Sequence, residues 1–362
     1  MNYEVLVVGA GVAGATAAAT LGALGHRVVL IERERLGEMR QVRPEWVTRQ
    51  ARPILDELQV DRAGCLGGPF GGAVFHSADF TRSAESAAKE APAFRVDYTK
   101  LVRRVNQAGG KLGVDRREGS APVRLQAAED HVTAVFDRGE SLVGRFLVIA
   151  DGGSSEAAAT PGDRKQWIVQ ARLAVPAAGQ DDRMHWVLGL SGGEALMAWW
   201  FDASGLVLEL HGAGRPGELA QRLRAAAASA SRKGALPAEL VIPESALRWR
   251  PAPGRPALEF DSHVGKHCLR IGDAGGFISA ASHEGIYPAM WSAQLASAVL
   301  SQALGSRHPQ DALHKFDSQW RMTMAEYLRL PNADTQFLLP LIFTNQQMAD
   351  RMAAACWRGE NI

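Results

Sequence analysis

YEVLVVGAGVAG, residues 3–14, is the stretch that decides the fold, and its first six residues form a short apolar run interrupted only by Glu4. Such a run is typical of a strand buried on both faces of a parallel sheet. Residues 13–24 follow with the alanine-rich pattern of a helix that Gly25 ends, and residues 27–31 form a second apolar run before Glu32. The order predicts one βαβ unit.

The turn between this strand and helix has the spacing Gly-x-Gly-x-x-Gly, at Gly9, Gly11 and Gly14. The first glycine permits a tight turn, the second lets a pyrophosphate approach the helix N-terminus, and the third lets helix and strand pack closely. Glu32, 18 residues after Gly14, can accept hydrogen bonds from ribose hydroxyls. The combination predicts a dinucleotide site, to which we also assign Val12, Ala13 and Arg33.

A second signal, LRIGDAGG at residues 269–276, favours FAD as the dinucleotide. An apolar strand ends here on Gly-Asp, so that Asp273 can reach a ribityl or ribose hydroxyl, and small residues leave space for a flat ring. The loop 282–286 then starts a long helix, expected at 286–304, whose N-terminal amides can stabilise negative charge on a reduced flavin.

With these motifs in order, the sequence resembles the FAD-dependent oxidoreductase superfamily with the p-hydroxybenzoate hydroxylase fold. Within it, the form Gly-Glu-Gly-Ile-Tyr is usual in the geranylgeranyl reductase and FixC-like branch, and here Glu284-Gly285-Ile286-Tyr287 matches its last four residues. Flavin monooxygenases and tryptophan halogenases are also relatives. The resemblance implies that Asp273 faces the FAD, that Gly285 and Ile286 meet the isoalloxazine edge, and that Arg95 sits beside the cofactor.

The fold expected is α/β, with a Rossmann-type FAD-binding domain interleaved with a β-sheet substrate domain and a C-terminal helical tail. We assign residues 1–159 and 261–327 to the FAD-binding domain, 160–260 to the β-rich substrate domain and 328–362 to the tail. Helical patterns are also read at 37–60 and 95–108.

Four side chains are candidates for chemistry. His283 and Glu284 lie in the loop expected beside the flavin, where a titratable group can move protons, although Glu284 can equally cap the following helix. Trp199 and Phe201 alternate along an expected strand and so share one face, which is predicted to wall a substrate pocket or to pack in the core.

The function expected is an FAD-dependent monooxygenase that hydroxylates an aromatic or lipophilic substrate through a flavin C4a-hydroperoxide, with NADH or NADPH as candidate electron donor. Geranylgeranyl reductases carry a cysteine after the second strand, and the corresponding residues 37–48 contain none. Two alternatives stay open: a reductase or dehydrogenase of a carbon–carbon double bond, and a flavoprotein that matures a partner protein. A separate reductase is a further candidate partner.

Composition excludes several other classes. The 40 Lys and Arg residues are balanced by 39 Asp and Glu and form no basic stripe, so nucleic acid is not an expected partner. Three separated cysteines give no metal-ligand spacing and fit a reducing compartment. No uninterrupted apolar run is long enough for a transmembrane helix, and we expect a cytoplasmic protein without a bound metal.

Overall fold

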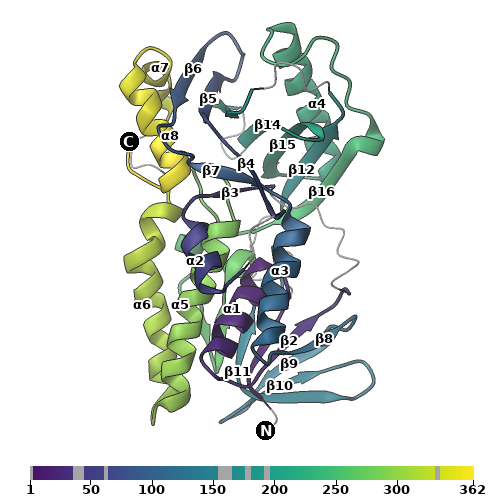
Figure 1. The fold of residues 1–362 in the computed structure, drawn as a ribbon, viewed down its shortest axis with the longest axis vertical. Coiled ribbons are helices and arrows are strands. Elements are labelled where there is room, and N and C mark those ends of the chain that lie inside the picture. Colours follow the sequence, from purple (N-terminus) through teal and green to yellow (C-terminus); the bar gives the residue numbers. More distant parts are fainter. Residues whose placement is uncertain are drawn as a thin grey trace.

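The structure is a computed structural model that describes residues 3–35, 45–60, 64–153, 165–175, 181–190, 196–330 and 335–362 (Figure 1). Its N-terminal unit comprises strand β1 (Tyr3–Val8), helix α1 (Val12–Ala23) and strand β2 (Val28–Glu32). β1 and β2 are parallel neighbours, and α1 is buried along nearly its whole length because alanine and glycine let it approach its neighbours closely. The predicted βαβ unit is confirmed.

The first sheet has the strand order β17-β18-β11-β1-β2-β8, with the antiparallel ribbon β9-β10 attached to β11. The strands β1, β2, β8, β11 and β18 are parallel to one another along this order. The added bounds are β8 (Asp115–Glu118), β9 (Arg124–Ala127), β10 (Val132–Val135), β11 (Ser141–Ile149), β17 (Val264–Gly265) and β18 (Cys268–Arg270).

Alternate residues of β1 enter two separate cores. Val5 and Val7 pack against a layer of helices, whereas Leu6 and Val8 pack against the β9-β10 ribbon. Both faces of the strand are therefore covered, as its unbroken hydrophobicity requires. The helices are α1, α3 (Tyr98–Lys111), α5 (Ile286–Gly305) and α6 (Pro309–Leu328), of which α1 contacts both α3 and α5.

A second sheet has the order β16-β12-β15-β14-β13-β5-β6, and helix α4 (Pro216–Arg232) packs on one of its faces (Figure 1). Its strands are β5 (Gly72–Ser77), β6 (Ser83–Ala87), β12 (Gln166–Leu173), β13 (Met184–Leu188), β14 (Leu196–Asp202), β15 (Gly205–Ala213) and β16 (Leu247–Ala252). β5 and β6 come from the stretch 1–159. The predicted boundary at 160 therefore misses two strands, because β5 pairs with β13 far along the chain.

Two of the expected helices differ from the prediction in their bounds. Within 37–60, residues 37–44 lie outside the described residues, and the rest forms strand β3 (Trp46–Thr48) and helix α2 (Ala51–Glu57). Within 95–108, strand β7 (Ala93–Val96) precedes α3. β7 pairs with β3 and with β4 (Leu66–Pro69) in a small sheet, and this tertiary pairing overrides the helical pattern around Arg95.

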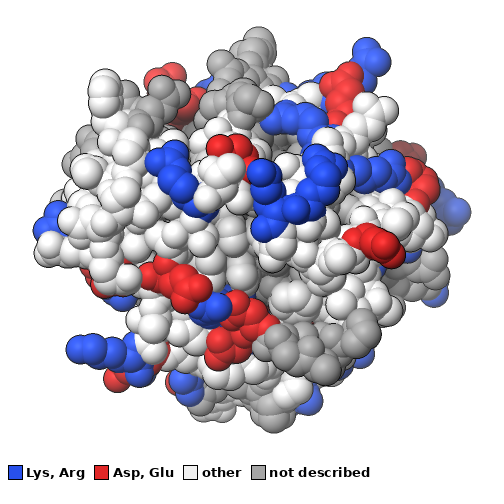
Figure 2. All heavy atoms as spheres, turned by 90° about the horizontal axis from the view of Figure 1, so that it is seen from above, with Lys and Arg blue, Asp and Glu red and all other residues white. Residues whose placement is uncertain are grey.

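The C-terminal tail forms helices α7 (Thr335–Ile342) and α8 (Gln346–Arg358). Ile342, Cys356 and Trp357 pack into an aromatic core with Trp46 and Trp186, so the tail docks on the second sheet. None of the helices in the described part of the chain has the length and apolarity that a membrane crossing needs. On the face seen from above, acidic and basic side chains are interspersed (Figure 2).

Candidate functional site

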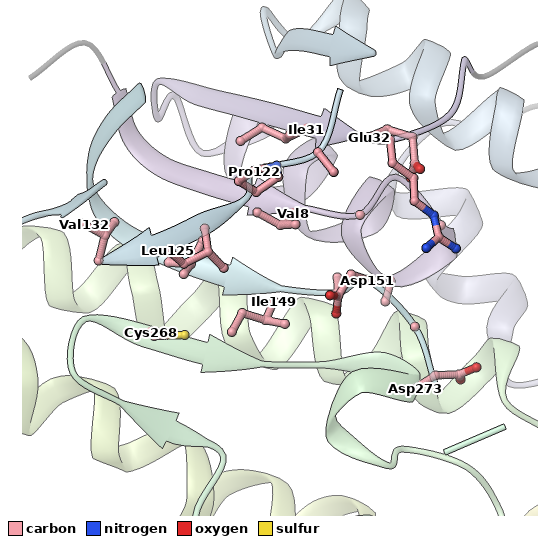
Figure 3. A pocket seen from close by; sticks show the side chains of 18 of the residues that line it. Val8, Ile31, Glu32, Pro122, Leu125, Val132, Ile149, Asp151, Cys268 and Asp273 are labelled. Carbon is pink, nitrogen blue, oxygen red and sulfur yellow. The ribbon is translucent and has the colours of Figure 1, made fainter. Parts of the chain in front are cut away.

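A cavity of about 610 Å³ opens at the carboxyl ends of β1 and β2, and Figure 3 shows part of its lining. The acidic side chains of Glu32, Asp151 and Asp273 lie toward one end. Apolar side chains, among them Val8, Ile31, Pro122, Leu125 and Ile149, line the other. A pocket with an apolar end and convergent polar groups matches a dinucleotide, which has a flat base and a polar ribose and phosphate portion.

The glycine turn shapes the wall of this cavity. A β-carbon at Gly14 would lie 1.8 Å from the carbonyl oxygen of Gly9, so the close packing expected there is observed. A β-carbon at Gly11 would meet only the Tyr98 hydroxyl, at 3.5 Å, and Gly11 lines the cavity at the N-cap of α1. Bare backbone at a helix N-terminus, facing a cavity, fits a pyrophosphate.

Glu32 is 8% exposed and holds two backbone amides. Its Oε2 accepts a hydrogen bond from the Ala10 amide at 2.7 Å, and its Oε1 accepts one from the Glu34 amide at 3.1 Å. The carboxylate therefore fixes the fingerprint turn against the end of β2. Val12, Ala13 and Arg33 line the same cavity, so the residues predicted around the fingerprint come together.

Asp273 reaches this cavity from the far end of the sequence, on the short 3₁₀ turn η3 (Gly272–Gly275) that follows β18. Its Oδ2 forms an ion pair with Nη1 of Arg250 on β16, at 3.1 Å. Both side chains are largely buried, at 14% and 5% exposed. No sequence pattern indicated Arg250, because the pair joins β16 to the turn η3 through tertiary contacts.

Arg95 is not among the residues that line the cavity. Its guanidinium donates hydrogen bonds to the carbonyls of Phe201 and Pro69, and it stacks on the Phe70 ring at 4.3 Å. Burial lowers the pKa of Arg95, with the nearby aspartates acting in the opposite direction. In this structure Arg95 joins β7 to β4 and β14. A role beside the cofactor stays a prediction.

Tyr98, three residues later, reaches the fingerprint turn. Its hydroxyl accepts a hydrogen bond from the Val12 amide at 3.2 Å, and its ring is buried in the helical core. The sequence signal was its place at the start of α3, directly after the capping residue Asp97, whose side chain accepts from the Lys100 amide.

Glu284 is fully buried at the start of α5. Its Oε1 accepts from the Tyr287 amide at 2.8 Å, and its Oε2 accepts from the Tyr327 hydroxyl at 3.0 Å. Burial raises the pKa of Glu284 to about 7, against the effect of these hydrogen bonds. Glu284 therefore caps the start of α5, which is one of the two roles considered for it from the sequence. Its carboxyl group also has a pKa near neutral pH.

His283, in the same loop, has a left-handed backbone with φ of +55°. Its ring lies 4.6 Å from the ring of His211 on β15, at an angle of 55°. Burial, reinforced by His211, holds the pKa of His283 well below its usual range, so the imidazole is neutral at pH 7. Strained backbone of this kind is concentrated at functional sites, although it does not prove a function.

Gly285 and Ile286 lie next to Asp273 without lining the cavity. Gly285 is the N-cap of α5, and a β-carbon there would lie 3.5 Å from Oδ1 of Asp273. Ile286 is 1% exposed. The loop that carries His283 and Glu284 is thereby joined to the Asp273 end of the site.

Trp199 and Phe201 share a face of β14, as predicted, but this face is turned toward α4. Trp199 is fully buried and stacks against His76 and His185, at centroid distances of 4.7 and 4.9 Å, and these two histidines are hydrogen-bonded to each other. The opposite face, which carries His211, is the one that approaches His283. This placement supports the core-packing alternative for Trp199.

Comparisons with known proteins agree on the fold. The pyridine nucleotide-disulphide oxidoreductase family model matches residues 3–180. A geranylgeranyl bacteriochlorophyll reductase-like protein from Thermoplasma acidophilum aligns with a TM-score of 0.76 at 15% identity, over 99% of this chain and 92% of that one. The search of curated protein sequences found no match.

Two further structures are similar over nearly their full length. PqsL from Pseudomonas aeruginosa, bound to 2-aminobenzoylacetate, aligns with a TM-score of 0.68 at 18% identity, over 97% of this chain and 99% of that one. A variant of a flavin-dependent brominase aligns with a TM-score of 0.71 at 15% identity, over 99% and 96%. The chain has the fold of the FAD-dependent oxidoreductases. The resemblance read from the motifs is thus confirmed at the level of the fold.

Proposed function

We propose that this FAD-fold protein is a monooxygenase that binds FAD in the cavity of Figure 3 and hydroxylates an aromatic or hydrophobic substrate. One observation carries the cofactor assignment. The glycine turn and Glu32 line one cavity together with Asp273, which lies more than two hundred residues later in the sequence. At the N-terminus of α1, backbone without a side chain at Gly11 forms part of the cavity wall. Bound FAD would supply two-electron redox chemistry between a nicotinamide donor, oxygen and the substrate.

Different residues of the cavity would bind different parts of FAD. Gly11, Val12 and Ala13 would hold the pyrophosphate at the start of α1, and Glu32 would keep that turn in place. The apolar end of the cavity would take the adenine, and Asp273 the ribityl chain. Arg250 pairs with Asp273, so a positive charge lies beside this carboxylate at the polar end of the cavity.

His283 and Glu284 are proposed to handle protons where α5 begins. Neutral His283 can either accept or donate a proton. Glu284, with a pKa of about 7, exchanges its proton near physiological pH while holding the Tyr287 amide. Glu284 is fully buried, whereas His283 is partly exposed.

Two observations favour oxygenation over double-bond reduction. The segment after β2 carries no cysteine at residues 37–48, although reductases of this kind have one there. Burial also raises the pKa of Cys268, which lines the cavity, to about 12, so its thiol is a poor proton donor. PqsL, described as a probable FAD-dependent monooxygenase, is among the similar structures.

The test is the visible spectrum of the purified protein, followed by NADH or NADPH addition without and with oxygen. A bound flavin that the nicotinamide reduces and oxygen rapidly reoxidises is expected. Without any bound flavin after reconstitution with FAD, the cofactor assignment fails.

A reductase is the second candidate, because Glu284-Gly285-Ile286-Tyr287 begins α5 in the form usual for that branch. The same experiment separates the two. A reduced flavin that persists in air and is reoxidised by an alkene would establish the reductase instead.

A further inference from the structure

A second cavity, of about 920 Å³, lies between helix α2, the segment 88–92 that joins β6 to β7, and helix α8. α8 packs against β6, as Figure 1 shows. None of the described residues that line this cavity also lines the cofactor cavity of Figure 3. A space of this size accommodates a small organic molecule, so it is a candidate for a second ligand site.

One wall of this cavity is apolar and is fixed by aromatic packing. Ala353, Ala354 and Trp357 of α8 line it, and all three are buried. The Trp357 ring packs edge-on against the ring of Trp46, with 5.6 Å between the centroids. Nε2 of Gln50, which also lines the cavity, donates a hydrogen bond to the carbonyl of Trp357 at 3.1 Å. The two alanines leave room beside an immobilised indole, and this surface suits the apolar part of a ligand.

Charged side chains of both signs line the rest of the cavity: the cations Arg49, Arg52, Lys89 and Arg358, and the acids Asp56, Glu90 and Asp350. Several of these charges already have partners in the protein. Arg49 pairs with Glu90, and Arg358 pairs with Glu360. Asp350 accepts a hydrogen bond from a glutamine of its own helix at 2.9 Å. The cations outnumber the acids, and the internal ion pairs use only two of the four cations.

Arg52 and Lys89 are the cations of this cavity that have no acidic partner in the described part of the chain. Arg52 is half-buried in the first turn of α2, and its guanidinium lies over the ring of Phe94, 5.2 Å from the centroid. This stacking restrains the side chain and leaves its N–H donors available. Lys89 approaches from the segment 88–92. Positive charges on two elements that border one cavity complement an anionic group between them.

We propose that this cavity binds an amphiphilic anion, a small acid whose apolar body lies against Ala353, Ala354 and Trp357 and whose anionic group lies between Arg52 and Lys89. A bare anion would leave the apolar wall without contact. A neutral apolar molecule would leave the two cations without a counter-charge. Both parts of the ligand are therefore required, and the site is independent of the function proposed for the cofactor cavity.

Titration calorimetry with three probes tests this requirement: 2-naphthoate has both parts, methyl 2-naphthoate lacks the charge, and acetate lacks the body. FAD is added throughout to keep the probes out of the cofactor cavity. The wild type is expected to bind 2-naphthoate about tenfold more tightly than either of the other probes, the difference that one charge-assisted hydrogen bond makes.

The double variant Arg52→Met with Lys89→Met removes the two cations and keeps unbranched side chains of similar length. It should bind 2-naphthoate no more tightly than the methyl ester. Arg103→Met with Lys111→Met is the matched control, because it removes two exposed cations of α3 that lie outside the cavity and changes the net charge equally. The control should keep the wild-type preference for the acid.

Ala87, exposed on the cavity wall, provides an independent variant. Ala87→Phe would place a ring in the cavity and should abolish binding of 2-naphthoate, while the melting temperature stays near that of the wild type. Equal binding of acid and ester by the wild type would overturn the proposal. So would a preference for the acid that survives in the Arg52 and Lys89 double variant or disappears equally in the α3 control, or a folded Ala87→Phe protein with unchanged affinity.

Discussion

The Tyr98 hydroxyl accepts a hydrogen bond from the Val12 amide at 3.2 Å, which brings the first residue of α3 onto the first turn of α1. The two residues are 86 positions apart, and Tyr98 lines the same cavity as the glycine turn. The Tyr98 hydroxyl therefore holds the turn whose backbone faces the cavity, where a phosphate would bind at the helix N-terminus.

Tyr98→Phe is therefore expected to weaken FAD binding about tenfold, because the Val12 amide loses the hydrogen bond that holds the turn, with little change in folding because the ring remains in the core. FAD affinity is measured by fluorescence quenching during titration of the apoprotein. Tyr3→Phe is the control, since the Tyr3 hydroxyl bonds Asp115 away from the cavity. Equal affinities of the two variants would show that Tyr98 serves packing alone.

The glycine turn offers a pair of substitutions with different outcomes. Gly11→Ala places a methyl group in the cavity in ordinary contact with the Tyr98 hydroxyl, so the protein should fold yet retain little FAD. Gly14→Ala drives a methyl group to 1.8 Å from the Gly9 carbonyl oxygen and should destabilise the βαβ unit itself. Melting temperature and flavin absorbance measure both effects. A folded Gly11→Ala protein with full FAD content would contradict the assigned phosphate position.

The βαβ unit could be predicted from sequence because its determinants are local: apolar runs, glycines at fixed spacing and a terminal acid. The side chains that contact Asp273 and His283 could not be predicted from the sequence. Arg250 reaches Asp273, and His211 reaches His283, only through the pairing of distant strands. The hydrogen bond between Tyr98 and the Val12 amide likewise depends on the packing of α3 against α1, which no local pattern records.

Trp199 shows a different limit. Alternation along β14 correctly predicted that Trp199 and Phe201 share a face, but both faces of this strand are buried. The pattern therefore contained no information on which face approaches the cofactor loop. Only the contact of α4 with one face and of His283 with the other settles the orientation.

The buried Glu284 predicts a pH dependence of stability. Its pKa is about 7 in the folded protein against an ordinary value of 4.5, so the folded state binds the proton more tightly than the unfolded state. The contribution of Glu284 to stability is therefore fully present below about pH 4.5 and decreases as the pH rises toward 7, by on the order of 3 kcal/mol.

Glu284→Gln should remove this slope, because a neutral amide has no proton to lose. Urea unfolding of both proteins between pH 5 and pH 8 gives the comparison, at approximately half-unit steps. Glu326→Gln changes a largely exposed carboxylate at the end of α6 and should keep the wild-type slope. Parallel curves for wild type and Glu284→Gln would contradict the raised pKa.

Variants of the buried ion pair between Asp273 and Arg250 can distinguish a structural role of Asp273 from a role in FAD binding. Asp273→Asn leaves the Arg250 guanidinium without its carboxylate and is expected to cost about 3–5 kcal/mol, because an uncompensated buried charge is unfavourable. The double variant Arg250→Met with Asp273→Asn removes both charges and should recover most of this stability. FAD binding should remain impaired in the double variant, since the carboxylate that faces the cavity is still missing. Chemical denaturation and FAD titration measure the two properties independently, and recovery of both together would show that Asp273 acts only through Arg250.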